Sequence, residues 1–457
     1  MNAVTATAEL GERIAPGPRG HFLLGSLPDV RRDILGFMHA LPETYGEVVR
    51  FRLGPETVHL VRRPEHVKHV LLDNHRNYSK DTHGFRALRR ILGNGLLTSD
   101  GEFWLRQRRI AQPAFHRKHI EGFASLMTHA AGEILEGWVS FARSGEAFDV
   151  AEEMTRASLR IVGRTLLGTD ITAQADAVAD AVTVVLHDAN RRLSQLFPMP
   201  DFVPTPYNRR FRAARATLDE IVLGMISQRR AKPIEGDLLG MLMAARDEET
   251  GEGMSDTQLR DEVMTLFLSG HETTAGALTW TFYLLSKNPS ARQRLLEEVA
   301  TVLQGRTPTA ADMPSLPYTT RVLQESMRLY PPAWTVTRRA IDRDTLGGYD
   351  VPAGTFVFLS PMVTHRHPEF WPDPESFDPD RFLPERFSSL PKQAYFPFGA
   401  GPRGCIGNGF AMLEAQLVLA CVSQRYQLEL VPDHPVVLEP LVSLRPKHGM
   451  VMTAHAL

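Results

Sequence analysis

The sequence predicts one mainly helical domain that also carries small β-sheets. Three observations lead to this fold class: helical periodicity dominates residues 64–246, a single long helical pattern follows Ser255, and strand patterns are short and lie near the N-terminus or after Pro332. No repeat, low-complexity tract or linker divides the chain. We therefore expect a single domain over residues 1–457.

The N-terminal half alternates between irregular and regular patterns. Residues 1–20 are rich in Ala, Thr, Gly and Pro, which favours an irregular arm laid over the core. Val48 to Arg63 places β-branched residues on both sides of Gly54-Pro55, the pattern of a β-hairpin. Helical periodicity then dominates, with breaks at 76–101 and 197–207. We predict long loops there, which could be binding loops or plain surface connections.

The second half is built around one long helix. Ser255 to Gln258 is a capping-box pattern, and the helical pattern continues to Asn288-Pro289. About 32 residues at about 1.5 Å each make a helix near 48 Å long. Its middle is apolar on most faces, which predicts a buried helix that crosses the domain. Short strands follow, and we expect a last helix from about Gly409 to Tyr426.

Charge and cysteine content exclude several classes of protein. Fifty-one Lys and Arg against 53 Asp and Glu leave a net charge of −2, which argues against a nucleic-acid partner. No apolar run approaches the length of a membrane span, and the N-terminus lacks a signal pattern, so we expect a cytoplasmic protein without a membrane span. Two cysteines, Cys405 and Cys421, are too few for a disulfide framework or a Cys-rich metal site.

Residues 398–407 pack four glycines around Cys405 just before the last helix. Their G-x-G-x-x-G spacing could mark a dinucleotide site, but flanking prolines and the missing second strand argue against it. Alternatively, Cys405 is the thiolate ligand of a haem iron. Glycines would let backbone N–H groups approach the sulfur, the helix N-terminus would add positive potential, and Phe398 would shield it from water. A structural cysteine in a tight turn is the plain alternative, to which we assign Cys421.

The run FGAGPRGCIG, residues 398–407, matches the haem-binding pattern F-x-x-G-x-R-x-C-x-G at every specified position. In this run the chain resembles the cytochrome P450 superfamily. The resemblance implies the cytochrome P450 fold, with haem b between a long I helix and an L helix. It makes Cys405 the axial ligand of the iron, and Phe398 and Arg403 cofactor-binding residues.

Two further motifs carry the resemblance. Glu325 to Arg328 resembles the ExxR of the family's K helix, and Pro379 to Phe382 resembles its PERF segment with Asp for Glu. The resemblance implies a structural triad of Glu325, Arg328 and Arg381. Because a literal PERF copy contains Arg386, the third member of the triad stays open.

Gly270 to Thr274, GHETT, resembles the oxygen-activation motif of the same family. An acid beside a hydroxyl can relay protons through water, so Glu272 and Thr273 are the predicted catalytic pair. Thr hydroxyls can also bond to the carbonyl four residues back and bend the helix. Ser269 stands where Ala or Gly is usual, and its hydroxyl either lies near the oxygen pocket or only caps a carbonyl. We expect His271 to be a packing or surface residue.

Haem propionates require cationic or N–H donors. Trp104 and Arg108 resemble the W-x-x-x-R of the family's C helix, and Arg338 matches a propionate-binding arginine after the K helix. The C helix is also strongly basic, with Arg106 and Arg109, so it either steers an acidic electron donor or is a solvated face.

Fifty-two residues follow Cys405, fewer than a reductase domain needs. We therefore expect the protein to take electrons from a separate donor, a ferredoxin or a flavodoxin with its reductase. We also expect a monomer. A non-catalytic haem sensor and a peroxide-dependent or rearranging enzyme remain alternatives, although variants of the second kind tend to lose the acid and threonine retained here.

The predicted activity is insertion of one oxygen atom of dioxygen into a C–H bond of a hydrophobic substrate. Positions inferred from the family give an apolar pocket. Its predicted lining residues are Phe85, Leu88, Leu268, Ala333, Val336 and Leu441. A fatty acid is our leading expectation, with terpenoids, steroids and polyketides open. Arg89 or Arg90 could pair with a substrate carboxylate, or both could be exposed.

Overall fold

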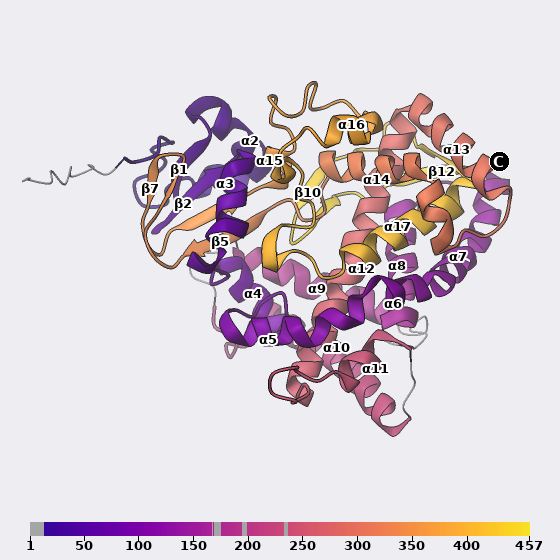
Figure 1. Ribbon diagram of the computed structural model, residues 1–457, viewed down its shortest axis with the longest axis horizontal. Helices are drawn as coiled ribbons and strands as arrows, with labels where there is room; N and C mark the ends of the chain where they lie inside the picture. The colour runs from indigo at the N-terminus through magenta and orange to yellow at the C-terminus, as the bar shows by residue number, and fades with distance from the viewer. Residues whose placement is uncertain (1–12, 167, 169–174, 194–198, 233–235) are drawn as a thin grey trace, which may run out of the picture.

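The computed structural model describes residues 13–166, 168, 175–193, 199–232 and 236–457. Figure 1 shows two parts, with strands β1 (Val48–Leu53), β2 (Glu56–Val61) and β5 (Val336–Ala340) on one side and the long helices on the other. The predicted fold class, mainly helical with small sheets, is confirmed. None of the described helices is both long and apolar enough to cross a membrane.

Helices account for most of the described chain. In order they are α1 (Leu27–Arg32), α2 (Ile34–Tyr45), α3 (Pro64–Lys68), α4 (His83–Leu92), α5 (Gly101–Ala111), α6 (Arg117–Gly122), α7 (Ala124–Ser144), α8 (Val150–Leu166), α9 (Ala175–Leu193), α10 (Pro206–Ala231), α11 (Leu238–Ala244), α12 (Asp256–Lys287), α13 (Pro289–Leu303), α14 (Pro317–Leu329), α15 (Pro361–Thr364), α16 (Pro384–Phe387) and α17 (Asn408–Ser423).

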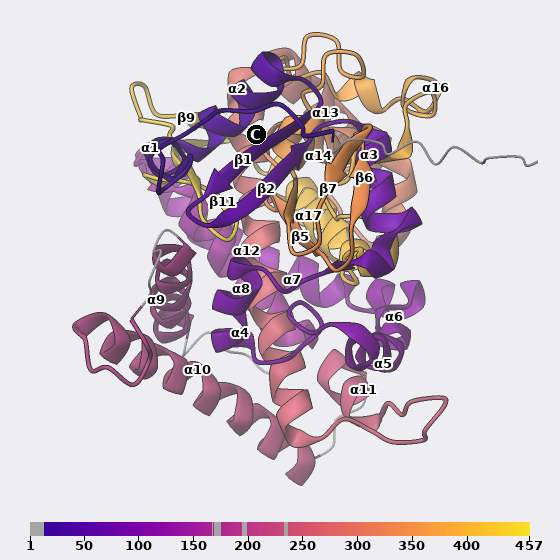
Figure 2. The ribbon, with the colours of Figure 1, turned by 90° about the vertical axis from the view of Figure 1, so that its left-hand side faces the viewer.

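The long helix α12 is the central element of the fold. Ser255 and Gln258 form the predicted capping box, each side chain bonding the other residue's backbone N–H. The helix ends at Lys287 before Asn288, as predicted. Figure 2 shows it running through the middle of the molecule beside α8, against which it packs. α12 is buried over most of its length. An exposed side chain in its middle would therefore indicate space beside the helix that the protein does not fill.

The main sheet has the strand order β1-β2-β8-β5-β3. The predicted hairpin is confirmed, with Val48 opposite Val61 and Leu53 opposite Glu56 in an antiparallel register. The described part of the arm, residues 13–20, contacts this hairpin, since the Arg50 N–H donates to the Pro16 carbonyl at 2.8 Å. The remaining strands are β3 (Tyr78–Ser79), β4 (Phe148–Asp149), β6 (Asp344–Leu346), β7 (Tyr349–Val351), β8 (Phe356–Leu359), β9 (Tyr426–Leu430), β10 (Leu438–Pro440), β11 (Leu444–Pro446) and β12 (Val451–Ala456).

Two predicted boundaries are wrong. The stretch 76–101 is not a plain loop, because His83–Leu92 forms α4, which buries Ala87 and Ile91 one turn apart. The last helix ends at Ser423 rather than Tyr426, because Tyr426 begins β9 and pairs with β12. The second predicted loop is irregular over 199–205, and its residues 197 and 198 lie outside the described part of the chain.

Candidate active site

The cysteine loop is a tight turn in front of α17. Gly401 has φ +69°, and a Cβ there would lie 1.9 Å from the Leu71 carbonyl oxygen, so only glycine fits. The Cys405 N–H donates to the Phe398 carbonyl at 2.9 Å, which closes the turn. Residues 391–400 form no strand, so the loop lacks the β-strand that a dinucleotide site needs. The glycines here shape the surroundings of a cysteine.

The Cys405 side chain is the exposed one of the two thiols, whereas Cys421 is buried in α17. Desolvation by the surrounding protein raises the pKa of the Cys405 thiol, while a hydrogen bond from the Gly407 N–H and the charge of Arg108 lower it. A thiol in this setting gives up its proton to a metal ion that coordinates it. Arg108 is held near the loop because its Nη1 donates to the Gly404 carbonyl at 3.0 Å.

The predicted oxygen-activation motif lies where α12 becomes accessible. Residues 261–268 are all buried, whereas Ser269 is exposed and Thr273 is half-buried. The Ser269 hydroxyl donates to the Thr265 carbonyl at 2.5 Å, and the Thr273 hydroxyl donates to the Ser269 carbonyl at 2.7 Å. Ser269 thus caps a carbonyl. An accessible stretch in the middle of a buried helix leaves room for a bound group beside it.

The acid of the motif has partners that the sequence did not indicate. Ser443, just before β11, and Arg445, on β11, both donate to the Glu272 carboxylate. The neighbouring His271 is buried and its Nδ1 lies 2.8 Å from the Phe267 carbonyl, so it packs within the helix. Burial lowers the pKa of His271.

Three cations near the cysteine loop lack an acidic partner among the described residues. Lys80, Arg108 and Arg338 form no ion pair there, although Lys80 and Arg338 are buried. Burial and the charge of Arg403 lower the pKa of Arg338 to about 10. Burial, followed by the charges of Arg338 and Arg403, also lowers the pKa of Lys80. Buried cations gathered without carboxylates make a site for an anionic group.

Lys80 was missed by the sequence analysis. Its Nζ donates to the Leu97 carbonyl at 2.9 Å and lies 5.1 Å from the centre of the Phe85 ring. The signal available was weak, because a single lysine in a polar stretch is most often exposed.

Trp104 and Arg403 contact each other directly. The Arg403 guanidinium stacks on the buried Trp104 ring at 3.6 Å from its centre. Arg403 also donates to the Ser99 carbonyl at 2.9 Å and pairs with Asp100. Asp100 is therefore already engaged and leaves the other cations uncompensated.

The structure places Arg381, not Arg386, beside the ExxR pair. Arg328 Nε and Nη2 donate to the two Glu325 oxygens at 2.7 and 2.8 Å, and both side chains are fully buried. Arg381 Nε lies 3.3 Å from Glu325 Oε1. Arg386 instead lies 3.6 Å from Asp378 on the surface. Two arginines, Arg328 and Arg381, therefore lie against the one buried carboxylate of Glu325.

The predicted pocket residues differ in exposure. Leu268 and Leu441 are buried, and Ala333 is exposed. Phe85, Leu88 and Val336 are half-buried.

The two arginines near this pocket differ in their partners. Arg90 pairs with Asp188 at 2.7 Å and Asp201 at 2.5 Å, and its guanidinium lies 4.1 Å from the centre of the Phe211 ring. Arg89 donates to the Thr98 carbonyl at 2.5 Å. Arg90 is thus neutralised by two carboxylates, whereas Arg89 has no acidic partner among the described residues and its buried Nε makes no hydrogen bond there.

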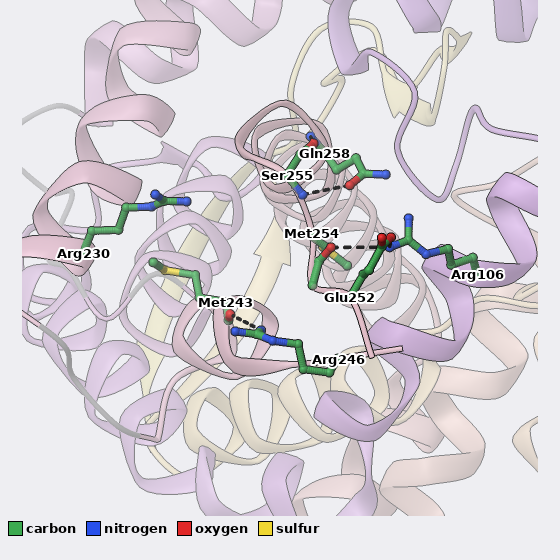
Figure 3. A pocket seen from close by; sticks show the side chains of 9 residues that line it. Arg106, Arg230, Met243, Arg246, Glu252, Met254, Ser255 and Gln258 are labelled. Carbon is green, nitrogen blue, oxygen red and sulfur yellow. Dashed lines mark hydrogen bonds and ion pairs between the residues drawn. The ribbon is translucent and has the colours of Figure 1, made fainter. Parts of the chain in front are cut away.

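The basic face of α5 is largely neutralised by the loop that precedes α12. Arg109 pairs with Asp247 at 3.1 Å and Glu249 at 2.6 Å, and Arg106 donates to Glu252 at 3.0 Å. Figure 3 shows the Arg106 and Glu252 pair at the edge of a pocket of about 450 Å³. This pocket is lined by Arg106, Arg230, Met243, Arg246, Glu252, Gly253, Met254, Ser255 and Gln258, none of which belongs to the site above.

Together the donor set fits haem. A solvent-accessible thiol at a helix N-terminus, an accessible stretch of α12 with an acid and a hydroxyl, and buried cations without carboxylates match an iron ligand, an oxygen-binding side and two propionates.

Comparisons with known proteins agree with this geometry. Residues 15–452 match the family model described as cytochrome P450. The chain is 40% identical to cyclooctatin synthase of Streptomyces melanosporofaciens, over 96% of this chain and 95% of the relative. It is 37% identical to pentalenene oxygenase of Streptomyces avermitilis, over 91% of each. A crystal structure of the cytochrome P450DA heme domain superposes with a TM-score of 0.89 at 28% identity, over 98% of both chains. The chain therefore belongs to the cytochrome P450 family and is a haem-thiolate monooxygenase.

Proposed function

We propose that this protein is a terpenoid hydroxylase in which one domain spans the chain and Cys405 is the iron ligand. The substrate C–H bond and one oxygen atom of dioxygen become C–OH, and the other oxygen atom leaves as water. Two electrons from a donor protein and two protons balance the reaction. The bound haem would supply the place where dioxygen is activated.

The residues that would hold the haem are those of the cysteine loop and the cation cluster. Cys405 would give the axial sulfur, with Phe398 covering it. Arg108, Arg338 and Lys80, which form no ion pair with a carboxylate among the described residues, would meet the propionates. Trp104 and Arg403 would support them as a stacked pair.

Glu272 and Thr273 would deliver the protons. The Thr273 hydroxyl lies on the accessible stretch of α12, next in sequence to the acid. A carboxylic acid and a hydroxyl joined by water can pass a proton toward the oxygen-binding side and recover another from solvent.

The observation that carries the substrate class is the apolar character of the predicted pocket lining. The predicted lining residues Phe85, Leu88 and Leu268 are apolar, and the nearby Arg90 is already paired with two carboxylates. A neutral hydrophobic molecule fits such a lining. Relatives of the chain are named for cyclooctatin, cyclooctat-9-en-7-ol and pentalenene. We therefore place a neutral terpenoid ahead of a fatty acid.

Spectral titration tests this order. The haem-loaded protein is titrated with pentalenene and with palmitate, and the Soret shift that accompanies loss of iron-bound water is recorded, followed by product analysis by mass spectrometry. We expect saturable binding and a hydroxylated product only for the neutral hydrocarbon class. Tight palmitate binding with hydroxylation, and no response to any cyclic terpene, would contradict the proposal.

The iron ligand has its own test. We expect the carbon monoxide difference spectrum of the reduced protein to show the thiolate-type Soret band, and the Cys405→Ser variant to lack it. A histidine-type band in both proteins would remove Cys405 from the site.

Electrons are proposed to come from a ferredoxin or a flavodoxin with its reductase, and the protein to act as a cytoplasmic monomer. The arginines of α5 that would face an acidic donor are paired with loop 247–252. Donor binding would therefore exchange these internal ion pairs for intermolecular ones.

A further inference from the structure

The carboxylate of Glu272 is held by side chains from a part of the chain more than 170 residues away. Ser443 Oγ donates to Glu272 Oε1 at 2.7 Å, and Arg445 Nε donates to the same oxygen at 2.7 Å. Arg445 Nη2 also contacts Oε1. All three donors converge on one oxygen. Within the described part of the chain, Oε2 accepts no hydrogen bond.

The two partners lie on a firmly anchored hairpin formed by β10 and β11. The Leu444 N–H donates to the Pro332 carbonyl at 2.9 Å, and the Trp280 indole donates to the Leu444 carbonyl at 3.1 Å. Leu444 is therefore fixed to α12 on one side and to the segment before β5 on the other. Because Ser443 and Arg445 flank Leu444, these bonds also fix their position beside the Glu272 carboxylate.

Burial makes the pair energetically significant. The Glu272 side chain is 10% exposed and that of Arg445 is 28% exposed. A carboxylate at this depth needs a cation or several donors to remain in place, and Arg445 supplies both. Removal of Arg445 would leave the carboxylate free to rotate toward solvent or toward another partner.

We propose that Arg445 and Ser443 are positioning residues of the proton relay, which bind Oε1 of Glu272 so that Oε2 is the oxygen that exchanges protons with water. The inference rests on the proposed relay of Glu272 and Thr273. Leu441, a predicted pocket residue, lies on the same hairpin, and its carbonyl accepts a hydrogen bond from the Trp334 indole at 2.9 Å. Contact between substrate and this hairpin is thereby connected to the orientation of the acid.

The test compares the haem-loaded wild type with Arg445→Gln, Glu272→Gln and the double variant. The control is Lys447→Gln. Lys447 is an exposed cation next to the same hairpin, and it pairs with no carboxylate among the described residues. With a ferredoxin and its reductase as donor and pentalenene as probe, the hydrogen peroxide released per NADPH and the solvent deuterium isotope effect on NADPH oxidation are measured. Thermal unfolding and the carbon monoxide spectrum report folding.

We expect Arg445→Gln to raise the peroxide yield about threefold or more and to increase the isotope effect, because a misplaced acid delivers protons slowly. The double variant should match Glu272→Gln, since both changes act through one carboxylate. Arg445→Lys should restore part of the coupling. If Arg445→Gln fails to fold, Ser443→Ala removes one donor of the same oxygen and is expected to shift both readouts in the same direction.

Two results would overturn the inference in distinguishable ways. If Glu272→Gln uncouples the enzyme while Arg445→Gln and Ser443→Ala behave like Lys447→Gln, the positioning role is wrong and the relay stands. If Glu272→Gln itself leaves both readouts at the wild-type level, the relay is wrong and the positioning role falls with it. Lower stability of Arg445→Gln with an unchanged isotope effect would identify a purely structural pair.

Discussion

Two clusters of buried charge in this protein are built in opposite ways. In the first, Arg328 meets the Glu325 carboxylate and also donates to the carbonyls of His365, Pro374 and Ser376. Arg381 lies on the outer side of this cluster, with its Nε 3.3 Å from Glu325 Oε1. In the second, Lys80, Arg108 and Arg338 gather without an acidic partner in the described part of the chain. A closed cluster stabilises the fold, whereas an open one indicates where an anionic ligand binds.

Breaking the closed cluster should have the largest effect. Arg328→Ala leaves the Glu325 carboxylate buried without its main partner and three carbonyls without a donor. We expect the free energy of unfolding to fall by about 3–5 kcal/mol, measured by urea denaturation, with loss of haem from the purified protein.

The matched control for this variant is Arg386→Ala. Among the described residues Arg386 forms one ion pair, on the surface, at 3.6 Å from Asp378, and its loss should cost less than about 0.5 kcal/mol. Equal losses in the two variants would show that the ExxR network is no more important than a surface pair.

Removing a cation from the open cluster should act on the ligand rather than on the fold. In Arg338→Gln one buried partner of the haem propionates is missing, so we expect haem to leave about tenfold faster, the value of one lost charged hydrogen bond. The rate is measured by transfer of haem to excess apomyoglobin.

Arg339→Gln is the control on the same strand, since Arg339 pairs with Asp81 at 3.2 Å. It should release haem at the wild-type rate. If both variants released haem equally fast, the open cluster would not be the propionate site.

A buried carboxyl group that forms no ion pair among the described residues gives a comparison with the opposite sign of charge. Glu262 on α12 is buried and accepts the Leu96 N–H at 2.9 Å. Burial raises its pKa to about 7. Between pH 4.5 and 7 the folded state holds a proton that the unfolded chain has released, so its contribution to stability is full below that window and is lost as the pH rises through it.

Glu262→Gln keeps an acceptor for the Leu96 N–H and removes this loss. We expect the variant to gain about 2–3 kcal/mol over the wild type between pH 5 and pH 8, in urea denaturation of the haem-loaded protein. A difference in stability that does not change with pH would show that Glu262 is ionised throughout.

Local signals predicted much of this molecule. The capping box at Ser255 and the stop at Asn288 marked both ends of α12, and the turn at Gly54 marked the first hairpin. The cysteine loop was identified because the residues that surround its sulfur follow one another in the chain. Such features depend on neighbours in sequence, which a single chain displays directly.

Features that arise from tertiary packing were not predictable. α4 was mistaken for a loop because Arg89 and Arg90 obscured its short apolar stripe, and α17 was drawn too long because the pairing of Tyr426 with β12 competes with helix formation. Lys80 and Arg445 gave no local signal. Each acquires its role from partners that the folded chain brings together.

The open cation cluster should also make the stability of this protein depend on the supply of haem. Charges that repel one another until a cofactor arrives make haem a folding ligand, worth about 4 kcal/mol when its free concentration is a thousandfold above its dissociation constant. We therefore expect chains made under iron scarcity to be less stable and more accessible to proteases than chains that bind haem. For the same reason, recombinant production should depend on added haem precursor more strongly than on culture temperature.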